Sequence, residues 1–331
     1  MGCSAVSVRK HVVVFHETTD PAWQWISHHL PEFEWVFVRA PAPGGGVLSK
    51  LARLRCAFQA ARAARSADLV VSLGPGLGSA LEIARRIIGV TTQHCSYYLN
   101  FDHMPYGLTR KRQALPYRMI DRFVVSSTME RSLYSAHFGI DPERIDVILW
   151  SVNPPVATDR RLVEGDYICA VGGNARDYAM LVRIARSRPH MQFVIVARPA
   201  NLEGLDIPPN VTSFCNIPFS DTMAIVRDAR AMALPLIATD TPCGHVTIVA
   251  AFYLGTPVAA TDSTGITDYI HDGENGLIAE SGSDEALRNA LDRLWNDPAL
   301  ANRIGEAGRA FASAHCAETN YSDHVRKLLS Y

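Results

Sequence analysis

Short apolar runs alternate with helix-like stretches along almost the whole chain. In the first half the runs that predict strands span residues 11–17, 34–40, 68–74, 90–95, 122–127 and 144–150. Helical patterns separate them, for example at 47–66, 77–88 and 128–138. Runs that are apolar on both faces and are separated by helices are typical of a parallel sheet covered on each side.

The pattern pauses at residues 153–166, which are polar, rich in proline and contain glycine, and then restarts. Strands are expected in the second half at 167–173, 192–198, 210–215, 230–236 and 257–262, before two helices at 284–295 and 299–314. We therefore expect an α/β protein with two tandem Rossmann-like, doubly wound domains and a ligand cleft between them.

The pause sets the expected domain boundaries. The first domain is expected to span residues 1–155 and the second 156–315. Residues 316–331 form a C-terminal helix, for which packing back on the first domain is one option.

Composition narrows the class of protein. The 331 residues are 48% hydrophobic and 20% charged, as in an ordinary globular enzyme. The 32 Lys and Arg balance 33 Asp and Glu, so no nucleic-acid partner is expected. The seven cysteines are scattered, without a Cys-x-x-Cys pair, and fit a reducing cytoplasm. We expect no leader, membrane span, metal site or cofactor.

One long motif resembles a known family. Residues 255–309 read "GTPVAATDSTGITDYIHDGENGLIAESGSDEALRNALDRLWNDPALANRIGEAGR". Its Gly-Thr-Pro-Val, Gly-Ile-x-Asp and Asp-Gly-Glu-Asn-Gly-Leu elements occur in the order found in retaining GT-B glycosyltransferases of family 4. The resemblance covers roughly residues 167–315; the first half matches in architecture alone.

The resemblance implies the GT-B fold and a metal-independent transfer of a sugar with retention of configuration. The donor would be a UDP- or GDP-linked sugar. The acceptor would be a hydroxyl group of a polysaccharide, a glycolipid or a natural product, and it could be a sugar, a lipid-linked molecule or a small molecule.

A candidate phosphate site precedes the motif. Gly244 and His245 stand just before an apolar helix, with Val246 and Thr247 in the same turn. Free amides and the helix dipole at such a start can hold a diphosphate, and the Thr247 hydroxyl could add a hydrogen bond. A buried helix with an ordinary small-residue start is the alternative.

Two arginines are candidates for the diphosphate clamp. Arg176 follows Gly172 and Gly173 in "GGNARDY", and Arg198 follows the apolar run "FVIVA". Ligands in open α/β sheets bind at the carboxyl ends of strands, and guanidinium groups suit the charge that builds on a leaving phosphate. Either arginine could instead be a surface ion-pair partner.

The resemblance implies two further groups near the donor sugar. Gly265 and Asp268 occupy the family's Gly-Gly-x-Pro-Glu turn, where Asp268 matches the acid; a helix-capping role is the alternative. His94, expected at the end of the fourth strand, matches a histidine that family members often carry. His94, Arg176 and Asp268 form the candidate catalytic set.

The acceptor side is expected in the first domain. His16 ends the first strand and is a weaker rival to His94. Gly76 lies in the loop "LGPGLGS", and Tyr97 and Tyr98 lie in an aromatic run that suits a sugar or an apolar acceptor.

Two basic stretches, 49–68 and 106–122, could lie on anionic lipid or could be solvated helix faces. The expected location is therefore the cytoplasm, with peripheral contact at the inner membrane face left open.

The family's paired acids are absent. The two glutamates of its Glu-x7-Glu motif fall on Pro242 and Ala250, and Asp240 is a possible substitute for the first. Losing a charge-assisted hydrogen bond to ribose costs roughly 1.5–3 kcal/mol, about ten- to a hundredfold in affinity. Two alternatives therefore stay open: a UDP-sugar epimerase of the same fold, and a catalytically silent homologue that binds nucleotide sugars.

Overall fold

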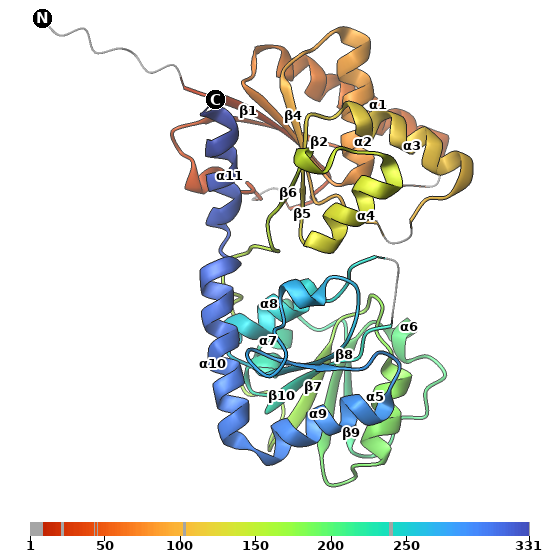
Figure 1. Cartoon of the computed structure of the whole chain (residues 1–331), viewed down its shortest axis with the longest axis vertical. Coiled ribbons are helices and arrows are strands. Elements are labelled where there is room, and N and C mark those ends of the chain that lie inside the picture. The colour runs from red at the N-terminus through yellow and green to blue at the C-terminus, as the bar shows by residue number, and fades with distance from the viewer. Residues whose placement is uncertain are drawn as a thin grey trace, which may run out of the picture. The chain divides into compact units, whose positions relative to one another are not determined.

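The computed structural model describes residues 9–20, 23–42, 44, 46–101, 104–237 and 241–330. The chain divides into two compact units, Met1–Ile148 with Glu318–Tyr331 (unit 1) and Leu149–Ala317 (unit 2). Each unit is a parallel sheet with helices on both faces (Figure 1), which confirms the expected α/β class. The predicted cleft between domains stays a prediction, as do the predicted domain bounds.

Unit 1 has six parallel strands in the order β2-β1-β3-β4-β5-β6. The strands are β1 (His11–His16), β2 (Glu34–Arg39), β3 (Leu69–Leu73), β4 (Gln93–Tyr97), β5 (Arg122–Val125) and β6 (Ile145–Val147). The helices are α1 (Val47–Ala63), α2 (Pro75–Ile88), α3 (Gly107–Met119), α4 (Thr128–Phe138) and α11 (Thr319–Leu329), with a 3-10 turn η1 (Ser27–His29).

The core of unit 1 follows from alternation along its strands. Successive side chains of a strand point to opposite faces of the sheet. On β1, Val12 and Val14 pack with Tyr321 and Val325 of α11, whereas Val13 and Phe15 pack with the alanine-rich helix α1 and with α2. The C-terminal helix therefore completes the core of the sheet with which the chain begins.

Unit 2 repeats the architecture, in the order β12-β11-β10-β7-β8-β9. Its strands are β7 (Tyr167–Val171), β8 (Gln192–Ala197), β9 (Val211–Cys215), β10 (Ala231–Leu234), β11 (Val258–Thr261) and β12 (Leu277–Ala279). Its helices are α5 (Tyr178–Arg186), α6 (Pro199–Leu202), α7 (Phe219–Arg227), α8 (His245–Leu254), α9 (Asp284–Asn296) and α10 (Pro298–His315), with a 3-10 turn η4 (Ile266–Asp268).

Two sequence expectations need correction. The strand β12 was not expected, because three residues are too few to show a period. The fourth strand begins at Gln93 rather than at residue 90, because the preceding residues end helix α2. Gly89 there has a φ of +71°, and the amide of Val90 donates to the carbonyl of Arg85. His94 therefore lies near the start of β4 and not at its end.

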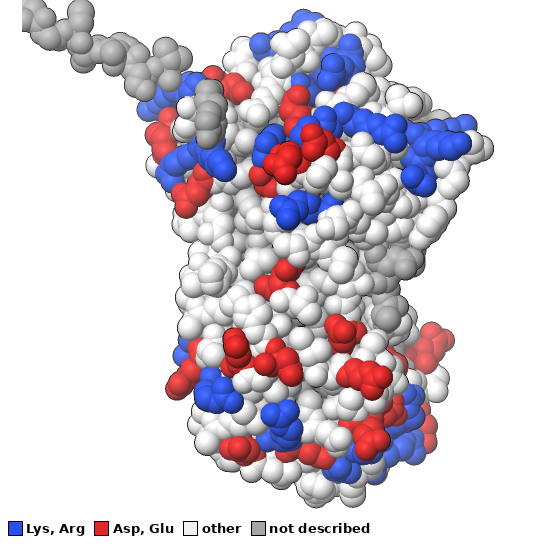
Figure 2. All heavy atoms as spheres, in the orientation of Figure 1, with Lys and Arg blue, Asp and Glu red and all other residues white. Residues whose placement is uncertain are grey.

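The outer surface of α1, α2 and α3 is basic and partly apolar. Exposed lysines and arginines are Lys50, Arg55, Arg62, Arg86, Arg110, Lys111, Arg112 and Arg118. Glu82 is the one carboxylate on these three described helices, and it is buried. In Figure 2 basic side chains gather, without acidic ones, where Figure 1 places α3. Leu48, Leu51, Leu108 and Leu115 are more than half exposed on the same helices.

No helix in the described part of the chain is both long and apolar enough to cross a bilayer.

Candidate functional site

The loops at the carboxyl edge of the unit 2 sheet bring the expected donor residues together. Gly172, Gly173 and Arg176 follow β7, Arg198 follows β8, the 244–247 turn opens α8 after β10, and Gly265 and Asp268 follow β11. These four strands are neighbours in a parallel sheet, so their carboxyl ends share one edge. The order along the chain alone did not place these loops side by side.

Arg176 is held inside this group of loops and is only 9% exposed. Its Nε donates to the carbonyl of Val171, its Nη1 to the carbonyl of Asn174 and to Cys243 Sγ, and its Nη2 to Thr247 Oγ1 at 2.9 Å. Among the described residues, four of the five guanidinium N–H donors are thus used internally, and one is left for a ligand. The side chain also fixes the Thr247 hydroxyl at the start of α8.

Glycine is required beneath that guanidinium. Gly172 has a φ of +111°, and a Cβ there would lie 2.9 Å from Arg176 Nη2. Ala175 also has a positive φ, of +50°, in the same loop. An isolated antiparallel β-bridge joins the backbone of Arg176 to that of Leu236, which follows β10. The bridge holds the loop in a position from which the Arg176 side chain reaches α8.

Arg198 is the exposed cation of the pair. It stands at the start of α6 with its side chain beside Gly173, where a Cβ would come within 3.1 Å of Arg198 Nε. Both arginines therefore border the same glycine loop, one buried and one open to solvent. The buried one orders the loop, and the exposed one is free to turn toward an anion.

The start of α8 leaves two amides without an acceptor inside the helix. Gly244 has a φ of +97° and caps the helix, and its carbonyl accepts from the amides of Thr247 and Ile248. The amides of His245 and Val246 therefore have no acceptor within the helix. Val246 is half exposed, and Thr247 and Ala250 are partly exposed along the same face, one helical turn apart.

His245 is a neutral, buried ring in this turn. It stacks on Tyr269 with a centroid separation of 5.8 Å and lies 6.0 Å from Trp150. Burial, together with the positive charge of Arg176, lowers the pKa of His245 to about 4. An uncharged imidazole at neutral pH adds no positive charge beside Arg176 and the helix amides.

Two neighbours of this group were missed from the sequence. Tyr269, one residue after Asp268, stacks on His245 and accepts a hydrogen bond from the amide of Trp150. Ser263, two residues before Gly265, is buried, and its Oγ has no partner among the described residues. The one sequence feature that could have identified both residues is their position beside the expected turn at residues 265–268. Asp268 itself is partly exposed in η4, and Asp240 lies outside the described residues.

His94 in unit 1 is fully buried within a closed hydrogen-bond chain. Its Nδ1 lies 2.9 Å from Glu82 Oε2 and its Nε2 lies 2.9 Å from Ser72 Oγ. Burial favours a raised pKa for Glu82, but hydrogen bonds from His94 and Arg86 lower it to about 2. Burial lowers the pKa of His94, so the ring is a neutral donor to an ionised carboxylate.

The acceptor-side candidates lie near the carboxyl ends of their strands. His16 ends β1 and is packed against Trp23, with burial lowering its pKa, and Gly76 lies in the first turn of α2. Tyr97 is fully buried, and Tyr98 hydrogen-bonds to Trp25. Their contact with an acceptor, like the donor-side roles, stays a prediction.

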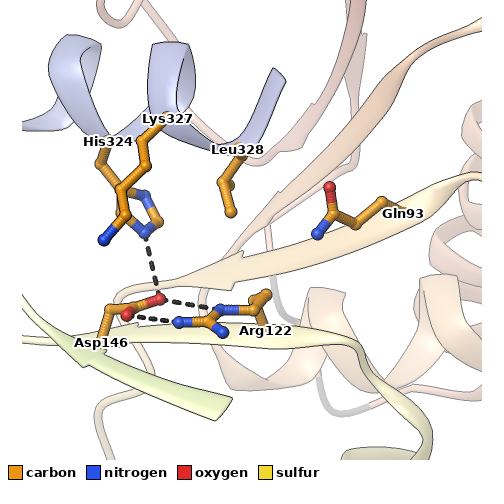
Figure 3. Close-up of a pocket in the computed structure, with 6 residues that line it drawn as sticks. All are labelled: Gln93, Arg122, Asp146, His324, Lys327 and Leu328. Carbon is orange, nitrogen blue, oxygen red and sulfur yellow. Dashed lines mark hydrogen bonds and ion pairs between the residues drawn. The ribbon is translucent and has the colours of Figure 1, made fainter. Parts of the chain in front are cut away.

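Hydrogen bonds connect Tyr97 to residues that line a cavity near the amino ends of β4 and β5. Its hydroxyl donates to His324 Nδ1 at 2.6 Å, and His324 Nε2 donates to Asp146, which also receives two bonds from Arg122. Figure 3 shows three members of this chain, His324, Asp146 and Arg122, beneath α11. The cavity, of about 490 Å³, is lined by Gln93, Arg122, Asp146, His324, Lys327 and Leu328. The network fastens α11 to β5 and β6.

Comparison with known proteins identifies the family of the chain. Residues 7–154 match the model of the family described as "Glycosyltransferase Family 4", and residues 189–311 match that of "Glycosyl transferases group 1". The lipopolysaccharide core biosynthesis glycosyltransferase LpsE of Rhizobium meliloti is 32% identical over 89 residues, covering 27% of this chain and 26% of its own. Other curated relatives are matched over about half of their length.

Solved structures show the same fold over nearly the whole chain. Sucrose-phosphate synthase from Thermosynechococcus elongatus has a TM-score of 0.75 at 17% identity, over 97% of this chain and 100% of that one. Anabaena HepE in complex with UDP has a TM-score of 0.74 at 14% identity, over 97% and 99%. With two family models that together match most of its length, this chain belongs to the GT-B glycosyltransferases of the group 1 and family 4 type.

Proposed function

We propose that the protein transfers a sugar from a UDP- or GDP-linked donor to a hydroxyl group of a polysaccharide or glycolipid, with retention of configuration. The observation that carries this proposal is that four loops with candidate donor residues, one of which opens α8, follow neighbouring parallel strands of unit 2. HepE binds UDP, and LpsE is named for lipopolysaccharide core synthesis, which supports the donor and acceptor classes.

The chemistry follows from where the charges lie. Cleavage of the sugar–phosphate bond builds negative charge on the leaving diphosphate, and preorganised donors stabilise that charge. In our proposal the exposed Arg198, the remaining N–H of Arg176 and the amides of His245 and Val246 supply those donors. They take the place that a divalent cation has in metal-dependent transferases, so we expect activity in the presence of EDTA.

The decisive experiment offers UDP- and GDP-sugars to the enzyme, with and without a panel of polysaccharide and glycolipid acceptors, in EDTA. Nucleotide release that requires an acceptor, with a new glycoside of retained configuration, supports the proposal. Conversion of the donor sugar without acceptor would identify an epimerase. Nucleotide binding without turnover across the panel would identify a silent homologue, for which the absent acids at Pro242 and Ala250 are the specific argument.

We also propose that unit 1 contacts an anionic membrane through α1, α2 and α3. Exposed leucines beside lysines and arginines, with no exposed carboxylate on these described helices, suit the boundary of an anionic bilayer. Vesicles containing phosphatidylglycerol should retain the protein, and phosphatidylcholine vesicles should not.

Charge reversal on α3 tests this contact. The change Lys111→Glu with Arg112→Glu should reduce vesicle binding at least tenfold, whereas Arg293→Glu on α9 of unit 2 should not. Equal binding by all three proteins would count against a membrane contact through α3.

A further inference from the structure

Two adjacent histidines and a distant glutamate meet on unit 1, and none of the three was assigned above to sugar transfer. His28 and His29 lie in the turn η1, and Glu318 caps the start of α11, 289 residues beyond His29. Their side chains are 48%, 24% and 21% exposed, so solvent reaches the group.

The three ligand-type atoms point at one place. His29 Nε2 lies 2.9 Å and His28 Nε2 lies 3.1 Å from the same oxygen, Glu318 Oε2, and all three atoms lie within 4.8 Å of one another. Ligand atoms around a tetrahedral Zn²⁺ are about 3.4 Å apart, given Zn–N and Zn–O bonds of about 2.1 Å. A small rotation of the side chains would admit an ion.

The backbone holds both imidazoles in place. Ile26 and Leu30, on either side of the pair, are fully buried in the core of unit 1. The carbonyl of His29 accepts from Arg326 Nη2 of α11, and Arg326 also binds Glu32. The turn and the helix are thus joined by contacts that do not involve the three ligand atoms, so the ligands are brought together before any ion binds.

We propose that His28, His29 and Glu318 form a zinc site that clamps the start of α11 to unit 1. Two imidazoles and one carboxylate are a donor set that Zn²⁺ accepts, with a fourth position left for water. The clamp acts where the chain returns from unit 2 to unit 1, so the ion stabilises the docking of α11.

Untagged, full-length protein, first treated with a chelator, provides the test. Titration with Zn²⁺ by calorimetry should show one site that is at least tenfold weaker in both His28→Ala and Glu318→Gln. Zn²⁺ should raise the Tm of the parent protein but not that of the two variants, and Mg²⁺ should do neither. The double change His271→Ala with Glu274→Gln is the matched control, because it removes an exposed His–Glu pair without a third ligand.

The free cysteines are the competing zinc ligands, and Cys215 is exposed. Co²⁺ separates the two sources, because a thiolate adds an intense sulfur-to-metal absorption that a site of nitrogen and oxygen lacks. A parent protein that binds no Zn²⁺ would overturn the proposal. Unchanged affinity for Zn²⁺ in His28→Ala and Glu318→Gln would also overturn it. An equally large loss of Zn²⁺ affinity in the control variant would do the same.

Discussion

At the scale of single residues, two arginines that have the same expected role from the sequence differ in their exposure to solvent. Arg176 and Arg198 both follow strands of unit 2, yet the first is buried among carbonyl groups and the second is exposed. Their expected roles differ accordingly: Arg176 orders the glycine loop and Thr247, and Arg198 meets the ligand directly.

Replacing Arg176 should therefore damage both stability and turnover. Arg176→Ala removes the guanidinium donor to the carbonyl of the buried Val171, and an unsatisfied buried group costs about 1–3 kcal/mol. We expect turnover to fall by more than tenfold and the Tm to drop. Arg183→Ala, which removes an exposed arginine of α5, is the control and should preserve turnover. Wild-type activity of Arg176→Ala would remove this residue from the donor site.

Restoring an acid at Ala250 tests where the ribose would bind. Ala250 is partly exposed on α8, one turn beyond Val246 and Thr247, so a longer side chain has room there. Ala250→Glu should tighten UDP or GDP binding about tenfold through a charge-assisted hydrogen bond, as measured by calorimetry. Ala250→Gln has the same length without the charge and should gain less. Unchanged affinity in the glutamate variant would mean that the ribose pocket lies elsewhere.

At the scale of elements, the ends of helices carry the features that matter. The start of α8 offers amides to a ligand, whereas α11 is fastened to a sheet that lies at the other end of the sequence. His324 bonds Asp146 and Tyr97, and Tyr321 and Val325 fill the core beside β1. These contacts make α11 a part of unit 1 rather than a tail.

Asp146 supplies a pH-dependent part of that attachment. Burial favours a raised pKa, but hydrogen bonds from His324 and Arg122 lower the pKa of Asp146 to about 2. A carboxyl whose pKa is depressed on folding stabilises the fold above its unfolded pKa, about 3.9, and loses that contribution as the pH falls toward 2. Asp146→Asn should therefore lower the free energy of unfolding at pH 7. The difference between the variant and the wild type should be smaller near pH 3.

Urea unfolding at both pH values measures this effect. Asp323→Asn, on the exposed side of α11, is the control, since an exposed ion pair contributes little. A stability difference for Asp146→Asn that is the same at pH 7 and pH 3 would contradict the assigned role of the carboxylate.

At the scale of the whole molecule, each unit has its own sheet, its own cores and its own set of candidate residues. Unit 2 holds the donor candidates, and unit 1 holds the acceptor candidates, the basic helices and the histidine pair. A ligand that binds the native state of either unit raises the apparent stability of the protein.

A nucleotide screen by thermal shift therefore addresses the whole chain. UDP or GDP at a hundred times its Kd should stabilise the protein by about 2.7 kcal/mol, and ADP should have less effect. The shift should be smaller in Arg198→Ala, since Arg198 is the exposed cation of the donor loops. Equal shifts with all three nucleotides would mean that the site does not distinguish the base.

The sequence by itself determined the fold class and the family. Apolar runs of strand length between helical patterns have one common solution, a parallel sheet covered on both faces, and the motif of residues 255–309 names the family. The sequence also identified the turns of unit 2 that carry the candidate donor residues. These turns lie at one edge of the sheet because the carboxyl ends of neighbouring parallel strands share an edge.

Only the tertiary structure decided how each side chain is used. Burial depends on what packs above a residue, so periodicity could not show that His94 is sealed against Glu82 and Ser72 or that Arg176 is turned inward. Contacts between residues hundreds of positions apart leave no local pattern at all. The network of Asp146 with His324 and the meeting of His29 with Glu318 therefore became visible only when α11 was seen against the first sheet.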